Sequence, residues 1–238
     1  NVNSFKGAGQ LSVIGMGNNT NAEGFSFMDM LNFNGGYNKA NDATGGPRLQ
    51  INMNDDMNNG GGNTNDGIKT IWGGGINYNN IIGNKTDFTS NYFYNRYSPN
   101  TESWTQRQYF LPDSSYFYNQ HALTKNLNNS HKLNLGADIQ LDSFHSIKIS
   151  PSLGYQQSST NTYSNYQTLS PEQRPGSEGF SDAYSYNEGF NFRNDILFRK
   201  KFRQKGRTFS LSLQNNWNTS DGDGSLITAN TFRNAAGQ

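Results

Sequence analysis

Residues 131–141 read HKLNLGADIQL, and this stretch decides the fold class. Its apolar residues recur at every second position, so Leu133, Leu135 and Ile139 share one face of an extended chain, while Lys132 and Asp138 lie on the other. Strict alternation over this length is typical of a β-strand that has one apolar and one polar face. The stretch therefore predicts such a strand.

The segment that follows has the same pattern. A polar link over 142–145 has the composition of a tight turn, and Ile147, Ile149 and Leu153 then alternate with polar residues up to Tyr155. Two alternating segments joined by a short polar link predict an antiparallel hairpin with one apolar face.

Similar alternation recurs along the chain. It is found around 11–17, 72–78, 88–94, 190–198 and 209–217. The sequence therefore predicts an all-β fold of about eight strands, mostly paired across short turns. Residues 25–33 are the best helix candidate, but they are short and have no capping residue.

The composition is unusual for a globular domain. Only 32% of the 238 residues are hydrophobic, 16% are charged, and the net charge is +1. Aromatic residues reach 13%, and there are 37 asparagines and no cysteine. Disulfides and cysteine chemistry are excluded, and the charge balance argues against a nucleic-acid partner. Few aliphatic residues with many aromatic ones predict a protein without an ordinary packed core.

The spacing of the strands suggests how they are arranged. Short turns are expected near 6–10, 80–86, 141–146 and 199–207, and long polar loops near 20–68, 97–130 and 157–183. Alternating short and long connections are typical of outer-membrane barrels, which have short periplasmic turns and long outer loops. We therefore expect residues 1–238 to form part of an antiparallel up-and-down transmembrane β-barrel, with about eight strands of a larger barrel.

Aromatic residues stand near both ends of the expected strands, where a barrel has its two girdles. Phe209 and Trp217 are eight residues apart, about 26 Å of strand, or about 20 Å along the membrane normal at a tilt of about 40°. The predicted girdle residues are Tyr94, Tyr155, Tyr186, Phe198 and Trp217. The predicted membrane-facing residues are Leu133, Leu135, Ile139, Ile147, Ile149, Leu153, Phe190, Phe192, Ile196, Phe209, Leu211 and Leu213.

Residues 11–36, LSVIGMGNNTNAEGFSFMDMLNFNGG, carry a likeness to a known family. Supporting segments are SNYFYN at 90–95, RQYFLPDSSYFY at 107–118 and residues 130–143. On these segments the chain resembles the outer-membrane β-barrel family of TonB-dependent receptor-like proteins. The resemblance implies an internal segment of a longer barrel, because no plug, TonB box or regulatory-like domain is visible in the sequence.

The resemblance implies a role in nutrient binding or uptake in the outer membrane of a Gram-negative cell. The expected partners are outer-membrane lipids and, with them, TonB-type energy-coupling proteins or surface lipoproteins. The sequence is also compatible with two alternatives. One is a non-transporting barrel that acts as a structural or docking partner in a surface or secretion complex. The other is a soluble extracellular β-rich module that binds glycans.

No enzyme is expected, and no cofactor, metal or catalytic residue is assigned. His121, His131 and His145 are expected on three different links, without the spacing of a catalytic triad. The acidic stretches 55–66 and 221–225 offer oxygen ligands for calcium, but flexible outer loops explain them better. The ligand-binding residues and the substrate stay unknown.

The sequence also contains a basic run and a glycine run. Residues 199–207 hold six cations, and a position near anionic headgroups fits this run better than a solvated turn or a nucleic-acid patch. The glycines at 73–75 predict a bulge, a bend or a close approach within a strand.

Overall fold

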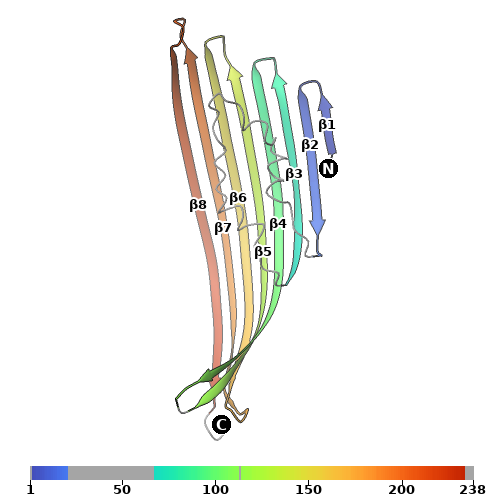
Figure 1. The fold of residues 1–238 in the computed structure, drawn as a ribbon, viewed down its shortest axis with the longest axis vertical. Coiled ribbons are helices and arrows are strands. Elements are labelled where there is room, and N and C mark those ends of the chain that lie inside the picture. Colours follow the sequence, from blue (N-terminus) through green and yellow to red (C-terminus); the bar gives the residue numbers. More distant parts are fainter. Residues whose placement is uncertain (1, 21–66, 113, 234–238) are drawn as a thin grey trace.

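The computed structural model describes residues 2–20, 67–112 and 114–233. These residues form one antiparallel sheet in which every strand pairs with the next along the chain (Figure 1). The strands are β1 (Val2–Lys6), β2 (Gly9–Asn18), β3 (Ile68–Ile82), β4 (Thr86–Phe110), β5 (Ser115–Gln140), β6 (His145–Leu169), β7 (Pro175–Lys201) and β8 (Thr208–Phe232). The prediction of an all-β antiparallel meander is confirmed.

The sheet is open in the described part of the chain. Strands β1 and β8 form its two edges and do not pair with each other. An open, curved eight-stranded meander is consistent with a segment of a larger barrel. None of the described residues forms a helix that is long and apolar enough to cross a membrane.

Four connections are tight and lie at one end of the sheet, the upper end in Figure 1. They span residues 7–8, 83–85, 141–144 and 202–207, inside the ranges expected from the sequence. Gly83 and Asn84 both have positive φ angles, 59° and 57°, as the twist of a tight hairpin requires. We call this the tight-turn end.

The expectation of long loops over 97–130 and 157–183 is wrong. These residues continue β4, β5, β6 and β7, and the connections at this end span only 111–114 and 170–174. The strands β4 to β8 are 25 to 27 residues long, or roughly 80 Å at 3.3 Å per residue. The third expected loop, 20–68, lies almost wholly outside the described residues, as do the helix candidate 25–33 and the acidic stretch 55–66.

Cross-strand side-chain pairs hold the long strands together beyond the alternating segments. Tyr109 stacks on Tyr116 with ring centroids 4.8 Å apart, and the Thr124 and Thr162 hydroxyls are 3.3 Å apart. Such pairs stabilise neighbouring strands without an apolar core. The strands therefore extend through sequence that is polar on both faces.

Asp142 organises the tight turn between β5 and β6. Its Oδ1 accepts hydrogen bonds from the backbone N–H groups of Phe144 and His145, at 2.7 and 2.8 Å, and its Oδ2 lies 2.9 Å from His145 Nδ1. The His145 side chain first, and then the Phe144 N–H, hold the pKa of Asp142 below its usual value. The folded turn thus stabilises the ionised form of the Asp142 carboxyl group.

This turn predicts a dependence of stability on pH. A depressed folded-state pKa stabilises the fold above the unfolded pKa of about 3.9, and this contribution is lost as the pH falls through the folded pKa. We expect Asp142→Asn to lower the melting temperature at pH 7. The melting temperature of this variant should also fall less than that of the wild type between about pH 5 and pH 3. Melting curves at both ends of this range check the prediction. Parallel pH profiles for the variant and the wild type would contradict it.

Candidate functional site: the apolar face and the aromatic row

The register places all the predicted membrane-facing and girdle residues on one side of the sheet. Leu133 pairs with Leu153, which pairs with Phe192, which pairs with Trp217, and partners in a register point to the same side. We call this side the apolar face and the other side the polar face. All seventeen predicted residues lie on the apolar face.

Charge is segregated between the two faces near the tight-turn end. Residues 86–94, 131–141, 145–155, 190–199 and 209–219 contain seven Asp, Lys and Arg side chains, and all of them lie on the polar face: Asp87, Lys132, Asp138, Lys148, Arg193, Asp195 and Arg199. The apolar face over the same residues carries no Asp, Glu, Lys or Arg. Its polar side chains include Ser90, the paired Asn194 and Asn215, and the histidines His131 and His145.

Polar contacts cover the opposite side. Arg199 Nη2 donates to Asp138 Oδ2 at 2.6 Å across β6, and Ser152 Oγ donates to Asn134 Oδ1 at 2.7 Å. One cation of the 199–207 run is therefore paired on the polar face. The alternation in the sequence thus becomes two chemically distinct surfaces of a single sheet.

A continuous aromatic row crosses the apolar face from β4 to β8. It consists of Tyr92, Tyr94, His131, Tyr155, Tyr186, Phe190 and Trp217. The ring centroids of Tyr94 and His131 are 4.8 Å apart, and those of Phe190 and Trp217 are 6.4 Å apart in an edge-to-face arrangement. The row marks the place where the charge-free part of the face ends.

Hydrogen bonds tie the tyrosines of this row to Glu188. The hydroxyls of Tyr155 and Tyr186 donate to Glu188 Oε2 at 3.2 and 2.8 Å, and Gln157 Nε2 donates to both hydroxyls. Beyond the row, charged residues return to the same side of the sheet, with Glu102, Lys125 and Asp182 among them. One face is thus apolar at its tight-turn end and polar at the other end.

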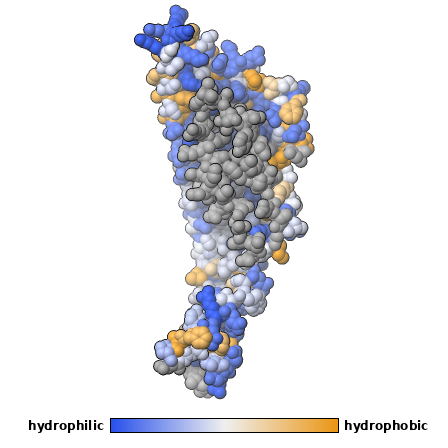
Figure 2. Space-filling view, in the orientation of Figure 1, coloured by the Kyte–Doolittle hydropathy of each residue, from blue (hydrophilic) through white to orange (hydrophobic). Residues whose placement is uncertain are grey.

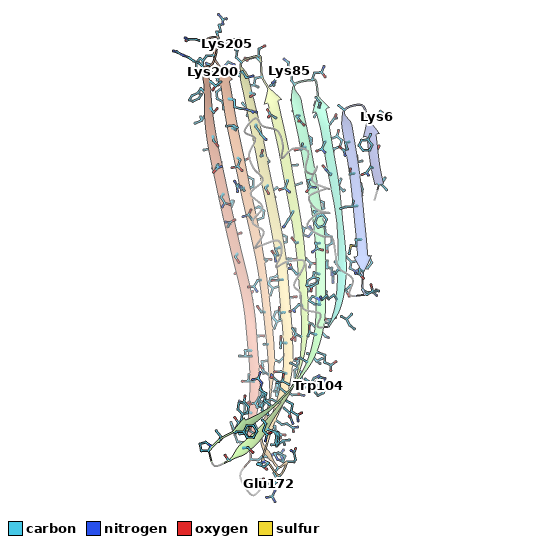
Figure 3. All side chains as sticks on the ribbon, in the orientation of Figure 1. Lys6, Lys85, Trp104, Glu172, Lys200 and Lys205 are labelled. Atoms are coloured by element: carbon cyan, nitrogen blue, oxygen red, sulfur yellow. The ribbon has the colours of Figure 1, made fainter. Side chains whose placement is uncertain are left out.

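The tight-turn end is edged by phenylalanine and cations. His145 stacks on Phe198 with centroids 6.0 Å apart, and Lys200 Nζ lies 5.3 Å from the centre of the Phe202 ring. Lys6, Lys85, Lys200 and Lys205 all lie at this end, whereas Trp104 and Glu172 lie at the other (Figure 3). Hydrophilic side chains cap the same end in the space-filling view (Figure 2).

The structure changes the position expected for several single residues. The histidines do not occupy three links, because His121 and His131 lie within β5 and His145 begins β6. His121 stacks on Trp104 at 3.8 Å, and its Nε2 lies 2.7 Å from Glu102 Oε1. Residues 221–225 belong to β8 and not to a flexible loop.

Within the described ranges, no group of three or more acidic or histidine side chains is arranged to hold a metal ion.

The glycines at 73–75 interrupt neither neighbouring ladder. Gly74 pairs with Gly15 on β2 and with Tyr94 on β4, and the register runs unbroken through all three glycines. The paired Gly15 and Gly74 remove two side chains from the apolar face beside the aromatic row. A groove of about 580 Å³ lies there, lined by Tyr92, Tyr94, Arg96 and His131 among others. The groove could not be predicted from the sequence because it depends on the register of β2 against β3.

No protein-family model, curated protein or solved structure matches this chain.

Proposed function

We propose that the chain is part of an outer-membrane β-barrel of the TonB-dependent receptor or transporter type, which binds nutrients or takes them up. The observation that carries this proposal is the one-sided distribution of charge. A bilayer excludes charged side chains from the surface that it touches, and a barrel wall alternates between lipid and a wet lumen. Near the tight-turn end, seven Asp, Lys and Arg residues lie on one face and none on the other, which matches that requirement.

The dimensions of the charge-free surface support a membrane location. Its two limits along β5 are His131 and, just after the strand ends, Leu141; they are ten residues apart, or about 33 Å of extended chain. At a strand tilt of about 40° this length spans about 25 Å along the membrane normal, the height of the apolar band in outer-membrane barrels. The aromatic row would then lie at one headgroup level and the Phe198 edge at the other.

The two ends of the sheet suggest an orientation. In outer-membrane barrels the short turns face the periplasm. On this basis the cations of 199–207 would meet the headgroups of the inner leaflet, where each gains up to about 1 kcal/mol if the lipids are anionic. The polar strand extensions beyond the aromatic row would project outward as a wall available to nutrients or to surface lipoproteins.

The polar face suits a water-filled interior. Asn, Ser and Gln side chains and the Asp138–Arg199 ion pair need no apolar cover there. The likeness to TonB-dependent receptor-like proteins then favours uptake driven by a TonB-type energy-coupling protein, with outer-membrane lipid as the surrounding partner.

Membrane extraction tests the location. Membranes from cells that produce the protein are washed with alkaline carbonate, which releases soluble and peripheral proteins. We expect the protein to stay in the outer-membrane pellet and to need detergent for release. Recovery in the carbonate supernatant would overturn the proposal in favour of a soluble glycan-binding module.

Growth on limiting nutrients tests the role. A strain that lacks the protein is compared with its parent across carbon sources and iron complexes, each supplied at low concentration. We expect slower growth on at least one nutrient, with the same defect in a parent that lacks its TonB-type coupling protein. Unchanged growth on all nutrients would favour a non-transporting barrel that serves as a docking partner.

A further inference from the structure

We propose that the groove beside the aromatic row binds the phosphate headgroup of an anionic membrane lipid, with an acyl chain lying over Gly15 and Gly74. The inference rests on the proposed membrane location and deepens it by assigning a specific lipid contact. The groove lies on the apolar face over β2 to β6 and has a volume of about 580 Å³, which is within the range of ligand sites in proteins.

Gly74 lines the groove, and its register partner Gly15 leaves the space beside it open, because neither residue has a side chain. Gly15 and Gly74 face each other in the register of β2 and β3, and a Cβ at Gly15 would meet no atom within 4 Å. Val13 and Ile76, the next pair on the same face towards the tight turns, give this part of the groove an apolar lining. This end of the groove therefore offers apolar side chains to a hydrocarbon chain.

The rim on the other side carries a cation. Arg96 lines the groove and lies next to Tyr94 and Asn129. Its side chain makes no hydrogen bond or ion pair with the described residues, and none of the described residues that line the groove carries a carboxylate. A guanidinium group offers a planar fork of donors that matches two phosphate oxygens. Arg96 is thus available for an anion at the level where the apolar surface ends.

The aromatic residues beside Arg96 indicate where it would lie relative to the membrane surface. Tyr92 and Tyr94 contact His131 on β5, with the Tyr92 hydroxyl 2.8 Å from His131 Nδ1, and the Tyr94 hydroxyl donates to Asn129 Oδ1 at 3.4 Å. These rings belong to the aromatic row, which is expected at the headgroup level. The apolar part of the groove would then lie at the depth of the acyl chains. Arg96 would lie at the depth of the lipid phosphates.

Lipid binding by the purified protein in zwitterionic detergent tests the inference. Native mass spectrometry measures the affinity for dimyristoyl phosphatidylglycerol and for dimyristoyl phosphatidylcholine, whose choline cation offsets its phosphate. We expect phosphatidylglycerol to bind about 10-fold more tightly, and Arg96→Gln to remove that difference. Arg107→Gln is the matched control, because Arg107 is on the same strand but on the opposite face. It should leave the preference unchanged.

A second variant tests the apolar part of the groove. Gly15→Leu adds an apolar side chain opposite Gly74, at a position where a Cβ meets open space, so it should narrow the groove. We expect it to weaken the binding of both lipids. An Arg96→Gln protein that keeps its preference for phosphatidylglycerol, or a Gly15→Leu protein that binds both lipids like the wild type, would overturn the inference. Inorganic phosphate that displaces bound phosphatidylglycerol as well as the same concentration of free lipid would also overturn the inference, because the site would then bind free phosphate.

The two levels of the proposal fail separately. If carbonate leaves the protein in the membrane but Arg96→Gln has no effect on lipid preference, the lipid site is wrong and the barrel stands. If carbonate releases the protein, the barrel and the lipid site both fail.

Discussion

Leu135→Arg and Leu213→Arg are each expected to lower the free energy of unfolding in phospholipid vesicles by about 2–4 kcal/mol. Both side chains lie on the apolar face, between the tight-turn end and the aromatic row. An arginine at either position would have to lose much of its hydration or distort the bilayer to stay hydrated. Urea titrations followed by tryptophan fluorescence measure the loss.

The neighbouring positions provide matched controls. Asn134→Arg and Ser212→Arg introduce the same side chain one residue away, on the polar face. They should cost much less, because the arginine remains in a wet interior near other polar groups. Equal losses on the two faces would contradict the assignment of the apolar face to lipid.

The second large effect is expected at Gly179 in β7. A Cβ there would lie 2.6 Å from the Ala229 carbonyl oxygen and 2.9 Å from the Tyr166 ring, and it would also collide with the Asn230 side chain. The backbone of β8 would have to move, so Gly179→Val should lower the free energy of unfolding by about 1–3 kcal/mol. The same urea titration measures this loss.

Gly189 provides the control on the same strand and the same face. A Cβ at Gly189 would meet only the Thr219 carbonyl oxygen, at an ordinary 3.6 Å. Gly189→Val should therefore be neutral or slightly stabilising, since valine suits a strand and restricts the unfolded chain. Equal stability of the two variants would show that β8 does not pack on β7 in the observed register.

The hairpin of β5 and β6 could be predicted from its sequence because only one of its faces is apolar. Leu133, Leu135 and Ile139 alternate with polar residues, and period-two alternation is a direct sign of a strand with two unlike faces. The same reasoning located β7 and β8 between 190 and 217. Turns were found because polar and glycine-rich links separate the alternating segments.

The outer halves of the long strands could not be predicted in this way. Both faces are polar beyond the aromatic row, so the alternation disappears although the backbone ladder continues. Residues 221–225 show the effect, because their Asp and Gly composition predicts a loop while β7 holds them as a strand. Tyr109, Trp104 and Thr124 favour strands, but such residues are weak evidence when no face is buried.

The groove depends on information that a sequence does not contain. Gly15 and Gly74 are far apart along the chain, and only the register of β2 against β3 brings them opposite each other. Arg96 is an ordinary basic residue until its neighbours are known. The aromatic row, in contrast, was partly visible, since Tyr94, Tyr155, Tyr186 and Trp217 were expected at this level.

A nitroxide scan along β5 tests most directly whether the apolar face contacts lipid. The chain has no cysteine, so single cysteines can be introduced at 132–135 and 137–139 without background labelling. In membranes, we predict high collision rates with oxygen at 133, 135, 137 and 139, and high rates with a water-soluble nickel chelate at 132, 134 and 138. Uniform access of the nickel chelate to all seven positions, or the opposite alternation, would contradict the account.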